Sequence, residues 1–144
     1  MQKASYDKDV VAWANEQAAL LRSGRFNELD IEHIADEVED VGKSERRELF
    51  SRMSQLISHL LKWKYQPERR GRSWRNSIRF QRSAISKHLK DMPSLNPLLR
   101  DPEWSQVIWG DAVQKAFDET GIDDLPLVFV WTIDQIMDDS FLPD

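Results

Sequence analysis

Apolar residues recur along this chain at intervals of three and four, which is the spacing of one face of an α-helix, and regular strand alternation is absent. The first series begins near Asp7 and continues through Leu21. Gly24 follows it, at a position suited to the left-handed residue that ends many helices. The pattern therefore predicts a first helix between these points.

A second series predicts one long helix from residue 31 to about residue 65, with Asp30 as its N-cap. Its apolar positions keep the same rhythm before and after Gly42: Ile31, Ile34, Val38 and Val41, then Leu49, Met53, Leu56, Leu60 and Trp63. The step from Val41 to Leu49 is close to two turns, so the apolar face stays in phase. Gly42 costs about 1 kcal/mol relative to alanine, which leaves open a break there with Ser44 restarting the helix.

Pro67 and Gly71 impose a turn after the long helix. A third helix is predicted from about Ser73 to Asp91, and a fourth from about Pro102, whose fixed φ suits a first helical position, to Gly121.

The segment LPLVFVW is expected to be extended chain over the core or an edge strand. Thr132 and Gln135 form a capping-box pattern for a short last helix. We therefore predict an all-α protein, a four-helix bundle with one long helix and a short C-terminal helical tail, in which residues 1–144 form a single domain.

Composition adds few constraints. The chain has 144 residues, 40% hydrophobic and 31% charged, which suits one soluble domain with a buried core. It has no cysteine, which excludes disulfides and thiol chemistry and is compatible with a reducing cytoplasm. The N-terminal segment MQKASYDKDVVAWANEQ lacks the apolar core of a signal peptide, and no run of about 18 apolar residues occurs. We expect a cytoplasmic protein without a membrane segment.

Charge is strongly segregated beneath the net value of −5. Residues 27–42 carry seven acidic side chains and no Lys or Arg, a net charge of −7. Residues 62–100 carry eleven basic and two acidic side chains (+9), and residues 101–144 carry one basic and eleven acidic side chains (−10). We expect the acidic flanks to pair with the basic segment, within one chain or in a dimer; the alternative is a basic surface that faces outward and meets phosphate.

The basic segment is the only stretch that suggests an external partner. We predict that its arginines and two of its tryptophans form the partner surface: Arg69, Arg70, Arg72, Arg75, Trp63 and Trp74. RNA or DNA binding through residues 62–90 is the alternative, because Arg and Lys neutralise phosphates and aromatic rings stack on bases. Against it, Trp63 and Trp74 lie on the predicted inner faces of their helices.

Several stretches resemble the bacterial domain-of-unknown-function family 29. They are YDKDVVAWANEQAALLRSGRFNELDIEHIADEVEDVGKSERRELFSR, HLLKWKYQPERRGRSWRNSI, PSL near residue 94 and DDSFLPD, in order along nearly the whole chain. The resemblance implies an all-helical fold and a full-length family member, and it implies no activity. Near the tail the chain has VFVWT where family members tend toward CPYT, so a polar tail contact is expected to be lost.

Catalytic chemistry has only weak candidates. One superfamily of helical-bundle ribonucleases places Arg four to six residues before His, with His transferring protons and Arg holding phosphate. Here Arg82 precedes His88 with five residues between them, and Arg52 precedes His59 with six. Because the chain contains many arginines, such spacings arise by chance. Glu-x-x-His pairs, glycine-rich phosphate loops and Gly-x-Ser-x-Gly are absent, so no metal, cofactor or small-molecule site is evident.

The composition and patterning favour a small helical protein-interaction or assembly module over an enzyme. A homodimer through the long helix is expected, since about 35 helical residues span roughly 50 Å, more than a compact bundle of this size needs. A protein partner on the basic segment fits the same hypothesis. The alternative is a nucleic-acid-binding bundle, including a metal-independent ribonuclease that uses His59, His88 or Arg82.

Overall fold

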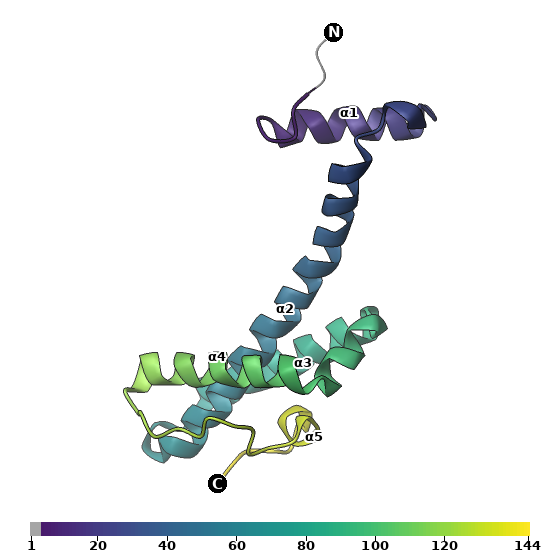
Figure 1. Cartoon of the computed structure of the whole chain (residues 1–144). Helices are drawn as coiled ribbons and strands as arrows, with labels where there is room; N and C mark the ends of the chain where they lie inside the picture. The colour runs from purple at the N-terminus through teal and green to yellow at the C-terminus, as the bar shows by residue number, and fades with distance from the viewer. Residues whose placement is uncertain (1–3) are drawn as a thin grey trace. The chain divides into compact units, whose positions relative to one another are not determined.

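The computed structural model describes residues 4–144, and within that range the regular secondary structure is helical, without a strand (Figure 1). The elements follow in the order α1 (Val10–Arg22), a 3₁₀ turn (Phe26–Glu28), α2 (Ile31–Tyr65), a 3₁₀ turn (Pro67–Arg69), α3 (Arg72–Asp91), a 3₁₀ segment (Pro93–Arg100), α4 (Pro102–Thr120) and α5 (Ile133–Met137). The predicted all-α class, the long second helix and the short last helix are confirmed.

The chain divides into two compact units, Met1–Glu45 and Arg46–Asp144, which we call unit 1 and unit 2. Unit 1 contains α1 and the first part of α2, and unit 2 contains the rest of α2 with α3, α4 and α5. A single domain over the whole chain stays a prediction.

Gly42 does not interrupt α2, so the alternative of a new start at Ser44 is excluded. The helix begins after Asp30, whose side chain accepts the backbone N–H of His33 at 3.4 Å. The first helix begins at Val10 rather than near Asp7. Its N-cap is Asp9, whose side chain accepts a backbone N–H in the first turn.

The ends of the last two helices follow local sequence signals. Asp101 caps α4 and Pro102 is its first residue, while Gly121 ends it with φ 75°, the left-handed conformation that glycine adopts at little cost. The capping box of α5 is confirmed: Thr132 Oγ1 accepts the Gln135 N–H at 3.1 Å, and Gln135 Oε1 accepts the Thr132 N–H at 2.8 Å.

Unit 2 has a continuous hydrophobic core to which α2, α3, α4 and the C-terminal segment all contribute. The largest fully buried apolar side chains are Leu49, Met53, Leu56, Ile57, Leu60, Leu61, Ile78, Ile85, Ile108, Trp109 and Ile136. The apolar face predicted for the second part of α2 is therefore the face that packs. In residues 4–144 no helix combines the length and the hydropathy needed to cross a membrane.

The segment between α4 and α5 is extended chain without a strand, and Leu125 and Trp131 anchor it in this core (Figure 1). The buried indole of Trp109 holds it: Nε1 donates to the Pro126 carbonyl at 2.7 Å. The Trp109 ring also contacts the rings of Phe129 and Trp131, with centroids 4.7 and 5.6 Å away. The prediction of extended chain over the core is thus confirmed, and the alternative of an edge strand is wrong.

Candidate functional site

The tryptophans of the basic segment belong to the core of unit 2. Trp63 is 5% exposed, and Trp74 is partly buried against the same core. Arg70 and Arg75 place their guanidinium carbons 5.3 and 5.4 Å from the Trp63 ring centroid, while Lys62 Nζ lies 5.6 Å from that of Trp74. These distances are typical of cation–π contacts. The rings therefore position cations, and they do not form an open platform for stacking bases.

Two arginines of the segment hold the C-terminal residues. Arg82 is 2% exposed; its Nε donates to the Ile136 carbonyl at 2.8 Å and its Nη2 to the Phe141 carbonyl at 2.7 Å. Arg70 donates from Nε to the Trp63 carbonyl at 2.6 Å and from Nη2 to the Pro143 carbonyl at 3.4 Å. Burial lowers the pKa of the Arg82 guanidinium, although the carboxylates of nearby acidic residues oppose this. Arg82 is thus a structural anchor for the tail.

The other arginines of the segment face solvent. In unit 2, no carboxylate lies within ion-pair distance of Arg69, Arg72, Arg75 or Arg79, all of which are exposed. Within residues 46–144, the expected pairing of these arginines with the acidic C-terminal flank is not formed. Pairing with residues 27–42, or in a dimer, stays a prediction. One cation of the basic segment does pair with the acidic C-terminal flank: the buried ammonium of Lys62 bonds Glu119 of α4.

A pocket of about 520 Å³ lies along α3, opposite the last residues of the chain. Its lining consists of Arg75, Ile78, Arg79, Arg82, Ser83, Ser86, Asp139 and Leu142. The α3 residues of this set are three and four positions apart, so they share one helix face. Three guanidinium groups and one carboxylate give the lining a formal charge of +2.

The two arginines expected beside the candidate catalytic histidines bond other groups. Arg52 bonds Glu48 and Gln81, each at 3.3 Å, and Arg82 bonds the C-terminal carbonyls. His59 Nδ1 lies 2.9 Å from a backbone carbonyl one turn earlier, and burial lowers the pKa of its imidazole. His88 is buried, with Nε2 3.8 Å from a carboxylate oxygen of Glu48. Ribonuclease activity stays a prediction without a supporting contact.

A serine–lysine–aspartate cluster that the sequence analysis missed links α2 to α4. Ser54 Oγ donates to Asp111 Oδ2 at 2.5 Å, and Lys115 Nζ lies 3.1 Å from the same carboxylate and 3.2 Å from Ser54 Oγ. Burial raises the pKa of the Asp111 carboxyl, but the hydrogen bonds from Ser54 and Lys115 outweigh it, and the net direction is downward. Because Ser54 is fully buried, the cluster joins two helices and offers no nucleophile to a substrate.

Unit 1 holds an aromatic and acidic cluster, also missed, where the N-terminal segment and α1 meet the start of α2. Asp30 Oδ2 accepts from Trp13 Nε1 at 2.9 Å and lies 2.7 Å from His33 Nδ1. Tyr6 stacks on Trp13 with centroids 4.8 Å apart and donates its hydroxyl to Glu37. That hydrogen bond, with burial and nearby carboxylates, raises the pKa of the Tyr6 phenol to about 12. The three rings contact one another, so they form a small core of unit 1.

We expect the stability of unit 1 to depend on pH, because this cluster shifts the pKa values of two of its members. The hydrogen bond to Asp30 raises the pKa of His33 above its ordinary value of 6.5 and lowers that of Asp30 below 3.8. The His33 contribution to stability is therefore complete below pH 6.5 and disappears as the pH rises through the folded-state pKa. The Asp30 contribution is present above pH 3.8 and disappears as the pH falls through its folded-state pKa.

We expect amide hydrogen exchange in α1, corrected for intrinsic rates, to become faster as the pH rises above 6.5 and through the folded-state pKa of His33. His33→Gln should remove this step. His59→Gln, a change in unit 2 at a histidine whose pKa is lowered, is the matched control and should leave the step in place. An unchanged pH profile in His33→Gln would refute the assignment.

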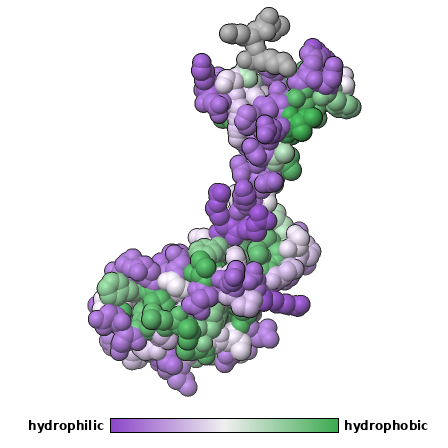
Figure 2. Space-filling model, viewed as in Figure 1, coloured by the Kyte–Doolittle hydropathy of each residue, from purple (hydrophilic) through white to green (hydrophobic). Residues whose placement is uncertain are grey.

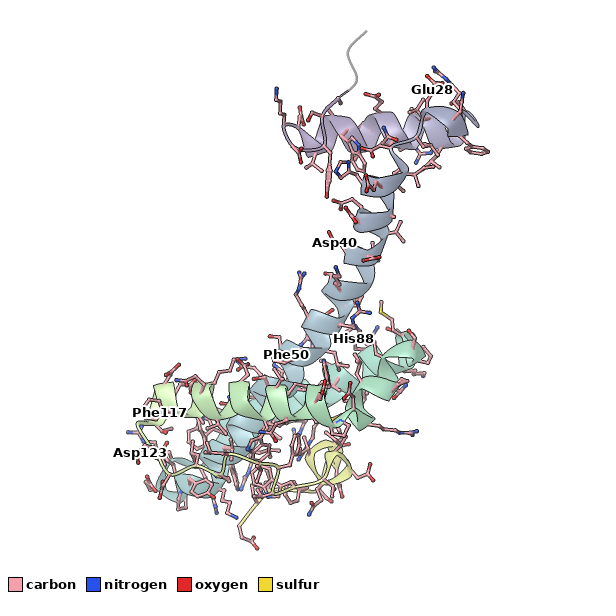
Figure 3. The ribbon with its side chains drawn as sticks, viewed as in Figure 1. Glu28, Asp40, Phe50, His88, Phe117 and Asp123 are labelled. Carbon is pink, nitrogen blue, oxygen red and sulfur yellow. The ribbon has the colours of Figure 1, made fainter. Side chains whose placement is uncertain are left out.

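The first part of α2 carries an exposed apolar stripe, which we define as Ile31, Ile34, Val38 and Val41. Ile31 is 69% exposed, Val38 67% and Val41 69%, and Ile34 is partly buried. Hydrophobic side chains are visible on the surface of this unit in Figure 2. Most acidic residues of this part of α2 lie on the other side of the helix, and Asp40, labelled in Figure 3, is one of them.

These features define an all-helical protein. Unit 1 has an exposed apolar stripe within an acidic segment, and in unit 2 four exposed arginines have no carboxylate within ion-pair distance among residues 46–144. The chain belongs to the family described as Domain of unknown function DUF29, whose family model matches residues 5–142. The resemblance noted from the sequence is thereby confirmed. Among curated proteins no match is found.

One solved structure shares the fold. It is an α-helical protein of unknown function from Rhodospirillum rubrum, 24% identical, with a TM-score of 0.58. The match covers 97% of this chain and 93% of that chain. At this identity the likeness shows a common fold and carries no information on activity.

Proposed function

We propose that this protein is a small bacterial, cytoplasmic assembly module in which two copies associate through the exposed stripe of α2. The observation that carries the proposal is the exposure of Ile31, Val38 and Val41, which are more than 65% exposed on one face of a helix. Clustered apolar side chains on one face are typical of interaction surfaces, whereas scattered ones need no explanation. Their burial by a partner contributes about 25 cal/mol per Å² of apolar surface.

Charge decides what the stripe meets on the second copy. If the stripes of two copies packed against each other, the contact would bring together two copies of residues 27–42, each with a net charge of −7. The exposed arginines of unit 2 have the opposite sign and no carboxylate partner in that unit: Arg69, Arg72, Arg75 and Arg79. Opposite potentials speed encounter and fix the orientation of partners. We therefore propose that unit 1 of each copy docks on the arginine surface of the other, which gives two equivalent contacts and a closed dimer.

Replacing Val38 with lysine should weaken association at least about tenfold, because a contact that buries valine would instead bury an ammonium. Val11→Lys is the matched control: Val11 is 68% exposed on α1 of the same unit and lies outside the stripe. The measurement is molar mass by light scattering across micromolar concentrations. Equal weakening by both variants would contradict the stripe as the docking element.

RNA or DNA binding remains the second candidate. It is supported by the four exposed arginines, which have no carboxylate within ion-pair distance among residues 46–144. It predicts a salt-dependent mobility shift that Arg69→Ala and Arg72→Ala reduce. Wild-type protein that shifts no RNA or DNA at low salt would eliminate this candidate.

A further inference from the structure

The pocket along α3 has features that dimer formation does not require. Its volume of about 520 Å³ lies within the range of about 300–1,000 Å³ that is usual for small-molecule sites. Exposed guanidinium groups of Arg75 and Arg79 line it, beside the hydroxyl-bearing Ser83 and Ser86. All of these groups can donate hydrogen bonds, and the arginines bring positive charge.

Arg82 adds a positive charge that the protein leaves without an ion pair. The side chain is 2% exposed, and its bonds to the Ile136 and Phe141 carbonyls supply hydrogen bonding without a negative charge. Among residues 4–144, no carboxylate lies within ion-pair distance of this guanidinium, although Asp139 lines the same pocket. Buried charges are generally paired, so a pocket beside an unpaired one favours a ligand of opposite sign.

The charge of the lining indicates the valence of that ligand. Three arginines and Asp139 leave a formal +2, and a phosphate monoester carries about −1.5 to −2 at pH 7. Guanidinium groups suit phosphate because they donate in pairs to its oxygens. The pocket is larger than phosphate alone, and its remaining wall is formed by Ile78 and Leu142, which are apolar. We infer that this pocket binds a small phosphate monoester, with the phosphate on the arginines and serines and the organic group against Ile78 and Leu142.

Phenyl phosphate is a suitable probe, because it combines the dianion with an apolar body. Titrated into the full chain at constant ionic strength and followed by calorimetry, it should show saturable one-site binding. Arg79→Gln should weaken binding about tenfold or more, the effect of losing one charge-assisted contact. Asp139→Asn should strengthen binding, because it raises the formal charge of the lining from +2 to +3.

Arg72→Gln is the matched control, since Arg72 is exposed at the start of the same helix and does not line the pocket. It should change the affinity by less than about twofold, as is usual for a surface change outside a site. Arg79 and Asp139 are exposed, so both variants should unfold at the wild-type temperature, which separates loss of binding from loss of fold.

Absence of saturable binding to wild-type protein would overturn the inference. Equal weakening by Arg72→Gln and Arg79→Gln would also overturn it, since that result describes a diffuse basic surface. So would a single-stranded oligonucleotide that binds more tightly than phenyl phosphate and is weakened equally by both changes. Arg79 also belongs to the proposed docking surface, whereas Asp139 does not. Dimer mass measured on the same samples reports on the assembly, and the effect of Asp139→Asn on phenyl phosphate binding reports on the pocket.

Discussion

Replacing Arg82 with methionine is expected to lower the free energy of unfolding by about 3 kcal/mol. The guanidinium is buried and bonds two main-chain carbonyls, those of Ile136 and Phe141, at 2.8 and 2.7 Å. Methionine fills much of the same volume but donates no hydrogen bond. Both carbonyls then lose a charged donor, and the Ile136 carbonyl loses it at a buried position. Urea denaturation followed by circular dichroism measures the loss.

Arg79→Met is the control for this change. Arg79 lies one turn earlier on α3, is exposed and has no carboxylate partner in residues 46–144, so its replacement should cost less than about 0.5 kcal/mol. Limited proteolysis should in addition show faster cleavage after α5 in Arg82→Met. Equal destabilisation by the two changes would show that the tail is not anchored through Arg82.

Replacing Trp109 with alanine should lower the free energy of unfolding by about 4 kcal/mol. The indole is fully buried, contacts the rings of Phe129 and Trp131, and donates to the Pro126 carbonyl. Its removal leaves a cavity under the extended segment and an unsatisfied carbonyl. Thermal and urea unfolding of the variant should show the loss.

Trp104→Ala supplies the comparison on the same helix. Trp104 is partly buried and contacts Phe50, labelled in Figure 3, edge to face with centroids 6.2 Å apart. Trp104→Ala should lower the free energy of unfolding clearly less than Trp109→Ala, because a partly buried side chain contributes less buried area. A loss at Trp104 as large as that at Trp109 would refute the role given to Trp109 in holding the extended segment.

The helix boundaries were predictable because they depend on local signals. Asp30, Pro102, Gly121 and the Thr132 capping box act within a few residues of where they stand, so they can be read without knowing the fold. Gly42 shows the limit of such signals. Its propensity cost allowed a break, and the helix formers on either side outweighed that cost.

Periodicity did not predict which part of the apolar face is buried. Val38 and Val41 belong to the same series of three- and four-residue intervals as Leu56 and Leu60, yet the first pair is exposed and the second fully buried. The spacing of residues on a helix determines which side chains share a face. What covers that face depends on residues distant in sequence, and in the stripe Ile31, Val38 and Val41 stay exposed while Ile34 is partly buried.

The role of Arg82 could not be predicted from the sequence for a related reason. Its spacing from Ile78 and Ile85, four and three residues, places Arg82 on the inner face of α3, although arginine is rarely buried. The partners of Arg82 are main-chain carbonyls 54 and 59 residues away. Every residue has a main-chain carbonyl, so the sequence does not indicate which carbonyls bond to Arg82. The net charge of a segment likewise gives no positions. It could not show that Arg69 and Arg72 have no carboxylate within ion-pair distance among residues 46–144.

The most direct test of the proposed assembly is the molar mass of the wild-type chain as a function of salt. Light scattering at low ionic strength should give about twice 16.9 kDa, and the mass should fall toward the monomer as salt screens the contact between acidic stripe and arginines. A monomer throughout the micromolar range at low salt would contradict the account. A dimer that becomes stronger with added salt would also contradict it, because that result indicates stripe pairing with stripe.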